Sequence, residues 1–444
     1  MVHMKRSALA GSLLAAMALL ATACGGGGSS ASGGDSADSP ADPGKVTGDI
    51  KVLTQRTDLV QDGTMKKYAA EFTKLYPKVH VTFEGITDYE GEVKIRMNTS
   101  NYGDVLMIPA AIKTLDYPKF FASLGTADAL AEQYTFTDKA TVGGKVYGIA
   151  NFANVQGFVY NKTVWQQAGI TDWPTTPDEF LADLAAVKAK TSATPYYTNY
   201  KDGWPLTAWT QVQGAATCDP KAGDEPATQS DPWQAGTDLN IGDTLLYDIV
   251  HDKLSEQDPT TTNWENSKNL LATGKIGTMW LGSWAIVQMQ DAAKKAGKDP
   301  GEIGYMPFPA QKDGKFCTPV APDYQEAVNI HSGHKAAARA WIDWFTDKSG
   351  YVQTNQAVPT LKGGAMPSAL KPFQDAGVRF VEMSQAQSAK VTSIDNQSEI
   401  GMTNKPDYRR HLIDVARGAA GGDLHGIFAD LAKKWASAQK TASL

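Results

Sequence analysis

The stretch between residues 50 and 109 constrains the fold most, because its apolar period changes from strand to helix and back. Residues 50–53 are a short strand candidate, and from Met65 to Tyr76 the apolar side chains recur at helical spacing. Residues 79–83 alternate as a half-buried strand does, and residues 104–109 read as a strand buried on both faces. Strand, helix and strand in this order predict α/β architecture with parallel pairing.

Three further helices are predicted along the chain. Thr176 and Pro177 have the chemistry of an N-cap and a first helical residue, and the apolar positions that follow keep helical spacing. Residues 335–345 and 427–438 show the same periodicity.

Composition limits the class of protein without naming an activity. With 444 residues the chain is long enough for two or three domains. Its formal charge of −6 provides no basic surface for nucleic acid, and three cysteines are too few for a disulfide scaffold.

The amino-terminal residues predict export. Lys5 and Arg6 precede an apolar run over residues 8–20, which is too short to cross a bilayer, so residues 1–23 are interpreted as a signal peptide. Small residues before Cys24 resemble a bacterial lipobox, which would make Cys24 lipidated and anchor the protein to the outer face of the membrane. Residues 24–45, rich in Gly, Ser, Asp and Pro, are predicted to be a flexible tether. The alternative is an ordinary secretory signal with an incidental cysteine.

The two other cysteines, Cys218 and Cys317, leave two alternatives open. In an oxidising compartment they can pair as a disulfide, or they can be separate buried thiols.

Four groups of segments, taken together, resemble the carbohydrate-binding group of extracellular solute-binding proteins of ABC importers, which includes maltose-binding protein. They lie in the same order over nearly the whole chain, at residues 72–81 with 102–105, 144–149 with 160–180, 274–284, and 337–344. The resemblance implies a two-lobed α/β fold of the type II periplasmic-binding-protein kind, with a ligand cleft between lobes joined by hinge crossovers. It assigns residues 46–153 plus 325–360 to lobe I and residues 157–320 plus 366–444 to lobe II.

A sugar site needs aromatic platforms beside side chains that exchange hydrogen bonds with hydroxyl groups. The loop after the first strand supplies Gln55, Arg56 and Asp58 at the edge where α/β sheets bind ligands. The resemblance places Asp104 in the cleft as well, although an Asp at the start of a strand can instead cap backbone groups.

The resemblance implies further ligand contacts. Asn154 corresponds to a polar cleft residue near a hinge, and Trp284, in a Gly-x-Trp segment, corresponds to a ring that stacks on sugar. The other candidates are Tyr200, Trp204, Trp280, Asp323, Tyr324 and Tyr408, of which Trp204 and Trp280 have core positions as their alternative.

The predicted function is that of a monomeric substrate-binding lipoprotein that captures a mono- or oligosaccharide by hinge closure and delivers it to ABC permease subunits. No enzyme activity, cofactor, metal or nucleic-acid partner is expected, since the sequence has no nucleophile elbow, P-loop or zinc-ligand spacing. The alternatives are a secreted lipoprotein glycosidase, for which carboxylate pairs without a signature are available, and a cell-envelope structural lipoprotein.

Overall fold

A computed structural model describes residues 36–40, 42–403 and 405–442. The predicted signal peptide, Cys24 and most of the predicted tether lie outside these residues. In the part of the chain described, no helix combines the length and the apolar character that a membrane span requires.

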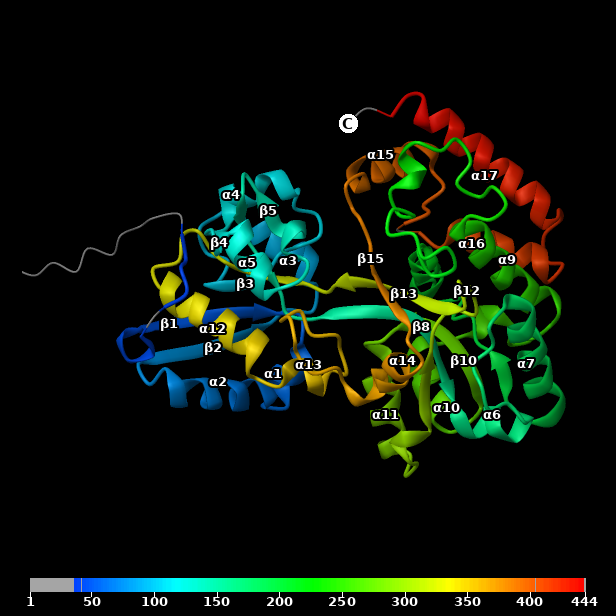
Figure 1. The fold of residues 1–444 in the computed structure, drawn as a ribbon, viewed down its shortest axis with the longest axis horizontal. Coiled ribbons are helices and arrows are strands. Elements are labelled where there is room, and N and C mark those ends of the chain that lie inside the picture. Colours follow the sequence, from blue (N-terminus) through cyan, green and yellow to red (C-terminus); the bar gives the residue numbers. More distant parts are fainter. Residues whose placement is uncertain (1–35, 41, 404, 443–444) are drawn as a thin grey trace, which may run out of the picture. The chain divides into compact units, whose positions relative to one another are not determined.

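Two sheets organise the fold, and we name the part around each sheet a lobe (Figure 1). The sheet of lobe I has five strands in the order β2 (Val79–Gly85), β1 (Gly48–Thr54), β3 (Val105–Met107), β14 (Gln325–Val328) and β7 (Ile149–Ala150). Strand β1 pairs in parallel with both β2 and β3, whereas β14 is antiparallel to β3 and β7. The predicted parallel arrangement is therefore confirmed for the first part of the chain.

The sheet of lobe II has seven strands. Its main path runs β12 (Gln311–Lys312), β13 (Lys315–Pro322), β8 (Ala153–Asn161), β10 (Ile276–Gly282) and β9 (Thr194–Tyr196), with β11 (Ile303–Met306) beside β8 and β15 (Arg379–Glu382) beside β13. A small third sheet in lobe I contains β4 (Gly125–Thr126), β6 (Lys145–Val146) and β5 (Thr141–Val142).

Helices cover both sheets. Those of lobe I are α1 (Thr57–Gln61), α2 (Thr64–Leu75), α3 (Tyr89–Arg96), α4 (Tyr117–Phe120), α5 (Ala127–Gln133), α12 (Lys335–Asp347) and α13 (Tyr351–Thr354). Those of lobe II are α6 (Lys162–Ala168), α7 (Pro177–Lys190), α8 (Trp204–Thr207), α9 (Asp238–His251), α10 (Trp264–Ala272), α11 (Ala285–Lys295), α14 (Lys371–Asp375), α15 (Ser388–Ser398), α16 (Asp407–Ala416) and α17 (Leu424–Gln439).

The apolar spacing and the capping residue that predicted two of the helices act as expected in the structure. In α2 the apolar face buries Met65 and Phe72, and the Phe72 ring packs edge-on against Trp341 of α12 with centroids 5.3 Å apart. At the start of α7 the Thr176 side chain accepts a hydrogen bond from the Glu179 amide, as the N-cap prediction required.

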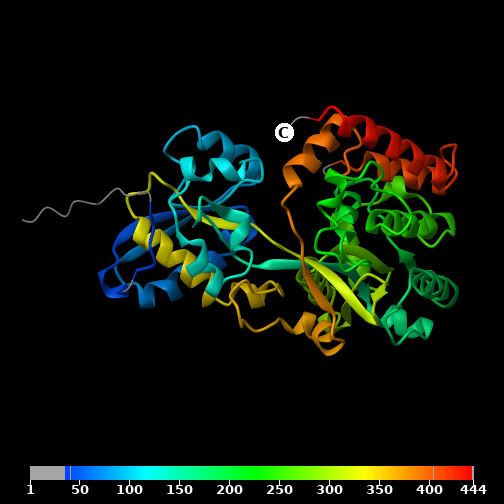
Figure 2. The ribbon, with the colours of Figure 1, turned by 45° about the horizontal axis from the view of Figure 1, so that its top comes forward.

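Three stretches of chain connect the two lobes. One joins β7 to β8, a second joins β13 to β14, and a third follows α13, where Val358 forms an isolated bridge with Ala153. The long strands β8 and β13 can be followed toward lobe I in both orientations (Figures 1 and 2). The residue boundaries assigned to the lobes from the sequence stay a prediction.

The last part of the predicted tether is packed on lobe I. Ala37 is buried, its amide donates to the Ser123 carbonyl, and the Arg339 guanidinium of α12 donates to its carbonyl oxygen. Asp42 caps a short 3-10 helix at Pro43–Lys45. Within the predicted tether, Ala37 thus has backbone partners in lobe I, whereas residues 42–45 are exposed and bond among themselves. The bounds of the tether stay a prediction.

Candidate functional site

A cavity of about 630 Å³ is lined by residues of both lobes. Lobe I contributes Gln55 and Arg56 between β1 and α1, Asp58 in α1, and Tyr351 and Asn355. The connecting stretches contribute Phe152 and Asp323. Lobe II contributes one face of α10 and α11, including Glu265, Lys268, Asn269, Trp284, Val287, Gln288, Asp291, Ala292 and Lys295.

The turn after β1 is built by its own polar groups. Thr54 ends the strand, and its hydroxyl accepts a hydrogen bond from the Arg56 amide at 3.1 Å. The chain then enters α1, with Arg56 at its N-cap position and Asp58 in its first turn. This segment follows the carboxyl end of a parallel strand, the edge at which α/β sheets bind ligands. The sequence predicted a polar loop here, and the short helix α1 replaces its second half.

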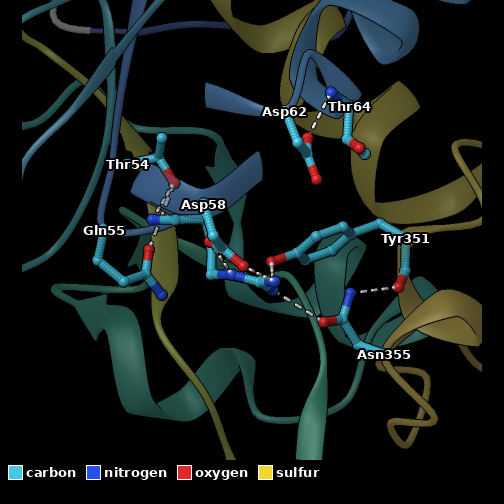
Figure 3. A network of polar contacts seen from close by, with 8 residues as sticks. Thr54, Gln55, Asp58, Asp62, Thr64, Tyr351 and Asn355 are labelled. Carbon is cyan, nitrogen blue, oxygen red and sulfur yellow. Dashed lines mark hydrogen bonds and ion pairs between the residues drawn. The ribbon is translucent and has the colours of Figure 1, made fainter. Parts of the chain in front are cut away.

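Arg56 is the centre of the polar network at this edge. Figure 3 shows its partners Asp58, Tyr351 and Asn355 from close by. Its Nε and Nη2 atoms donate to the two Asp58 carboxylate oxygens at 2.9 and 2.7 Å, a bidentate geometry. Its Nη1 atom donates to the Asn355 side-chain oxygen at 2.9 Å and to the Tyr351 hydroxyl at 3.3 Å. The guanidinium holds the pKa of Asp58 below its usual value through that hydrogen bond. Arg56 is therefore fixed by α1 and α13 together.

Asp323 lies in the stretch that joins β13 to β14. Its backbone amide donates to the Phe152 carbonyl at 2.9 Å, which ties two connecting stretches together. Burial raises the pKa of the Asp323 carboxyl to about 6, and a backbone hydrogen bond and the charge of Arg56 oppose that rise. Asp323 thus lines the cavity as a carboxyl whose pKa lies above its usual range.

The lobe II side of the cavity carries an indole. Trp284 stands directly before α11, and its ring lies 5.7 Å from Trp204 and 5.9 Å from Trp264. Lys268 of α10 lies over the Trp264 ring at 5.0 Å. An aromatic surface with amide, ammonium and carboxylate groups beside it can hold a molecule that has an apolar face and hydroxyl edges.

The cavity brings together the predicted residues Gln55, Arg56, Asp58, Trp284 and Asp323. Trp204 touches this group through its contact with Trp284, and 38% of Trp204 is exposed. Asn154 is not in the lining, and its side-chain oxygen accepts a hydrogen bond at 3.3 Å from Ser283, the residue before Trp284. Whether these side chains contact a ligand stays a prediction.

Tyr200 and Tyr324 point to partners outside the cavity lining. The Tyr200 hydroxyl donates to Asp414 of α16 at 2.9 Å, and the Tyr324 hydroxyl donates to Glu90 of α3 at 2.8 Å.

Two of the predicted aromatic ligands are core residues. Trp280 is 1% exposed, packs on Phe158, and donates its indole N–H to the Ala208 carbonyl at 3.0 Å. Tyr408 is buried and donates to Asp243, which also pairs with the buried Arg409. The prediction was wrong for both, because each ring fills the interior of lobe II and each polar atom already has a partner.

Asp104 is also misplaced as a ligand residue. Its carboxylate accepts hydrogen bonds from the Lys51 amide at 2.8 Å and from the Ser332 hydroxyl at 2.6 Å. It precedes β3, and because β1 and β3 are parallel, it lies at the amino edge of the sheet, opposite the edge that carries Gln55. Asp104 is therefore the backbone cap that was its alternative.

Several cavity residues were not predicted. Those of α10 and α11 are polar residues on amphipathic helices, and their sequence signal is the same as that of a solvated surface. The sequence gave little indication that Tyr351 and Asn355 line a cavity. They belong to the short segment after Gly350, which follows the predicted helix over residues 335–345.

The remaining calls on side-chain chemistry concern cysteines and metals. Cys218 and Cys317 form a disulfide in the structure, which selects one of the two alternatives. In the described ranges, no group of three or more His, Cys, Asp or Glu side chains is placed to hold a metal ion.

Comparisons with known proteins agree on one family. Residues 57–352 match the family described as "Bacterial extracellular solute-binding protein". The multiple sugar-binding protein of Streptococcus mutans is 27% identical over 313 residues, covering 68% of this chain and 71% of that protein. The diacetylchitobiose binding protein DasA of Streptomyces coelicolor is 30% identical over 406 residues, covering 84% and 88%.

Solved structures support the same assignment. The chain is similar to BlMnBP1, a binding protein of an ABC transporter from Bifidobacterium animalis subsp. lactis in complex with mannobiose, with a TM-score of 0.79 and 31% identity over 90% of this chain and 96% of that one. The predicted two-lobed α/β fold is thereby confirmed. The chain belongs to the bacterial extracellular solute-binding proteins.

Proposed function

We propose that the protein binds a short, neutral oligosaccharide between its lobes and delivers it to the permease of an ABC importer. The observation that carries this proposal is the cavity that both lobes line, in which Trp284 of lobe II shares a pocket with the Arg56–Asp58 pair of lobe I. A sugar has weakly apolar faces for an indole and hydroxyl edges for the charged and amide groups.

The relatives narrow the class of solute. BlMnBP1 and BlMnBP2 of Bifidobacterium animalis subsp. lactis were solved with mannobiose and mannotriose, and DasA is named for diacetylchitobiose. We therefore place di- and trisaccharides first among candidate ligands. The glycosidase alternative gains no support from these relatives, since each is named as a binding protein.

The mechanism of capture follows from contacts with both lobes. A solute that touches Trp284 and Arg56 together stabilises the arrangement in which the lobes approach each other, and it shifts the equilibrium by its difference in affinity between the two arrangements. The lobe-connecting stretches near Phe152 and Asp323 lie at the cavity itself, so a bound solute contacts the segments that must bend.

We further propose that the protein works as a monomer outside the cytoplasm, held at the membrane by a lipid on Cys24. The lipobox-like residues that precede Cys24 support this placement, and extracellular relatives agree with it.

A thermal unfolding screen tests the proposed solute. Mannobiose, mannotriose, diacetylchitobiose and raffinose are compared with the charged sugar acid gluconate. A ligand at 100 times its dissociation constant adds about 2.7 kcal/mol to the free energy of unfolding, so a bound sugar raises the melting temperature measurably. If no oligosaccharide raises the melting temperature above that of the protein with gluconate, the proposal is wrong.

A further inference from the structure

The lobes also meet at a place away from the cavity proposed to hold the solute, which we call the solute cavity. Lobe I contributes the short 3-10 helix Thr137–Ala140 to this place, and lobe II contributes the residues that follow β15. Together they line a separate cavity of about 580 Å³, which shares no lining residue with the solute cavity. The lobes are therefore in contact at a position that the three connecting stretches do not account for.

Lys139 of this 3-10 helix forms a hydrogen bond directly to lobe II. Its Nζ atom donates to the carbonyl oxygen of Met383 at 3.0 Å and pairs with the Asp138 carboxylate at 3.2 Å. The Lys139 side chain is only 10% exposed, so these oxygen atoms replace much of the water around its ammonium group. A hydrogen bond from a charged donor is stronger than one between neutral groups, so the bond to Met383 contributes to holding the lobes together.

Each end of this hydrogen bond is fixed to its own lobe. In lobe I, the Tyr147 amide donates to the Ala140 carbonyl at 2.9 Å, which ties the 3-10 helix to the small third sheet. In lobe II, β15 pairs with β13 as far as Glu382, and the Ser384 amide donates to the Pro220 carbonyl at 2.8 Å. A movement of one lobe relative to the other therefore changes the distance between Lys139 and its acceptor.

Phe136, the residue before the 3-10 helix, adds an apolar contact to lobe II. Its side chain is buried and belongs to the same apolar cluster as Val155 and Val320 of the lobe II sheet. Its backbone has a φ of 63°, in the left-handed region that residues with bulky side chains rarely adopt. Such a conformation persists only where the surrounding structure fixes it, which indicates a specific contact rather than an incidental one.

This contact and the solute cavity lie on opposite sides of the long strands β8 and β13. In Figure 1, β5 and α15, which directly follow the two contacting segments, are on one side, and α11 and α13, which line the solute cavity, are on the other. The same separation is seen in the second orientation (Figure 2). When two lobes turn about the stretches that connect them, approach on one side separates the other. Closure over a solute therefore pulls Lys139 away from Met383.

We propose that Phe136 and Lys139 form a latch that holds the lobes in the arrangement the structure shows, and that this latch lowers the affinity for solute without touching it. The proposal rests on capture of the solute by closure, as proposed above. The apparent dissociation constant is the intrinsic one divided by the fraction of molecules that are closed, and the latch reduces that fraction. Phe136 and Lys139 are thus positioning residues.

Removal of the Lys139 ammonium group tests the latch. Lys139→Met keeps the length of the side chain and removes the donor, so closed molecules should become about fivefold more common and oligosaccharide should bind about fivefold more tightly. The sign of the change is the readout, because a substitution that only damages the fold weakens binding. Calorimetric titration with the four oligosaccharides of the thermal screen measures it.

Three further variants complete this test. Lys139→Arg keeps a charged donor, and Lys145→Met removes an exposed lysine from the neighbouring β6, so both should bind within about twofold of wild type. Phe136→Leu shortens the apolar contact and should also tighten binding. It therefore tests the latch even if Lys139→Met does not fold.

A measurement without sugar separates the latch from the proposed function. Dyes are placed on Lys66→Cys of α2 and Lys433→Cys of α17, two exposed positions on different lobes, and single-molecule energy transfer counts the molecules in each lobe arrangement. Lys139→Met should enlarge the minor population about fivefold, whereas Lys145→Met should leave it unchanged.

Folded Lys139→Met and Phe136→Leu variants that bind oligosaccharide no more tightly than wild type overturn the latch and leave the proposed function standing. An enlarged minor population in a protein that binds none of the four oligosaccharides would support the latch while rejecting the proposed solute. If sugar binding and the minor population are both absent from the wild type and from Lys139→Met, both proposals are wrong.

Discussion

Trp280 and Trp284 are four residues apart, yet the fold gives them opposite environments. Trp280 is inside β10 and packs against Phe158 and Trp209, whereas Trp284 stands where the strand has ended and lines the cavity. The sequence offered both as ring platforms, because alternation along a strand does not say which face meets the core when both faces are covered.

This difference makes a paired prediction. Trp284→Ala should weaken oligosaccharide binding at least about 30-fold, roughly 2 kcal/mol, while the unliganded melting temperature changes little. Trp280→Ala should instead lower the free energy of unfolding by about 3–5 kcal/mol, because it empties a buried site. Calorimetric titration and thermal unfolding of both variants measure the two effects. Unfolding of Trp284→Ala would show that this ring is a core residue after all.

Asp323 predicts a pH dependence of binding. Its pKa is raised to about 6 by burial, so the carboxyl is ionised and a strong acceptor for sugar hydroxyls above this pH, and neutral below it. Oligosaccharide affinity should therefore fall as the pH is lowered from about 7.5 to about 5, whereas the affinity of Asp323→Asn should stay nearly constant. Calorimetric titration at both pH values measures this.

The pH dependence of the unliganded protein's free energy of unfolding has the opposite sign to that of binding, and it provides a control. Because the pKa of Asp323 is higher in the folded state than the ~3.9 of an unfolded Asp, the folded state binds more protons between about pH 4 and about pH 6. The Asp323 contribution to the free energy of unfolding thus decreases as the pH rises through this range. A wild-type and an Asn variant with parallel pH profiles would contradict this assignment.

At the scale of elements, the sequence predicted those parts of the site that follow from strand ends. Arg56 and Asp58 come directly after an apolar strand, where parallel pairing leaves polar residues at a binding edge. The faces of α10 and α11 could not be predicted in this way, because their polar residues become a cavity wall only when the other lobe stands opposite.

The ligand roles predicted for Tyr408 and Asp104 failed because each side chain has a polar partner within the fold. Tyr408 was expected to stack on ligand, but the Asp243–Arg409 pair gives its hydroxyl a partner in the core, and no local pattern announces such a pair. Asp104 shows the same limit, since its carboxylate serves a backbone amide of a neighbouring strand.

The disulfide between Cys218 and Cys317 gives a prediction about stability. The double variant Cys218→Ser/Cys317→Ser should lose about 2–5 kcal/mol of unfolding free energy, because the bond closes a long loop in the unfolded chain. Oligosaccharide affinity in the cleft should change less than threefold, about 0.7 kcal/mol, because neither cysteine lines that cavity. Denaturant unfolding and calorimetric titration measure the two effects. An unfolding free energy that is unchanged in the double variant would contradict the stabilising role given to this bond.

At the scale of the whole molecule, the proposed function requires that solute and lobe movement are coupled. Saturating oligosaccharide should reduce the radius of gyration measured by small-angle X-ray scattering, because contacts with both lobes favour the closed arrangement. The Trp284→Ala variant at the same sugar concentration is the control and should scatter as the unliganded protein does. A calorimetrically saturated protein whose scattering is unchanged would exclude capture by closure.

The packing of residues 36–40 on lobe I has a mechanical consequence. The Arg339 side chain of α12 holds the Ala37 carbonyl and pairs with Asp343, so the chain enters the fold through a clamp on one lobe. Any load applied upstream of residue 36 is therefore borne by α12 and the sheet beneath it. Within the described residues, lobe II is joined to lobe I through the three connecting stretches, so if the lobes close on a solute as proposed, lobe II is the one expected to move relative to the membrane.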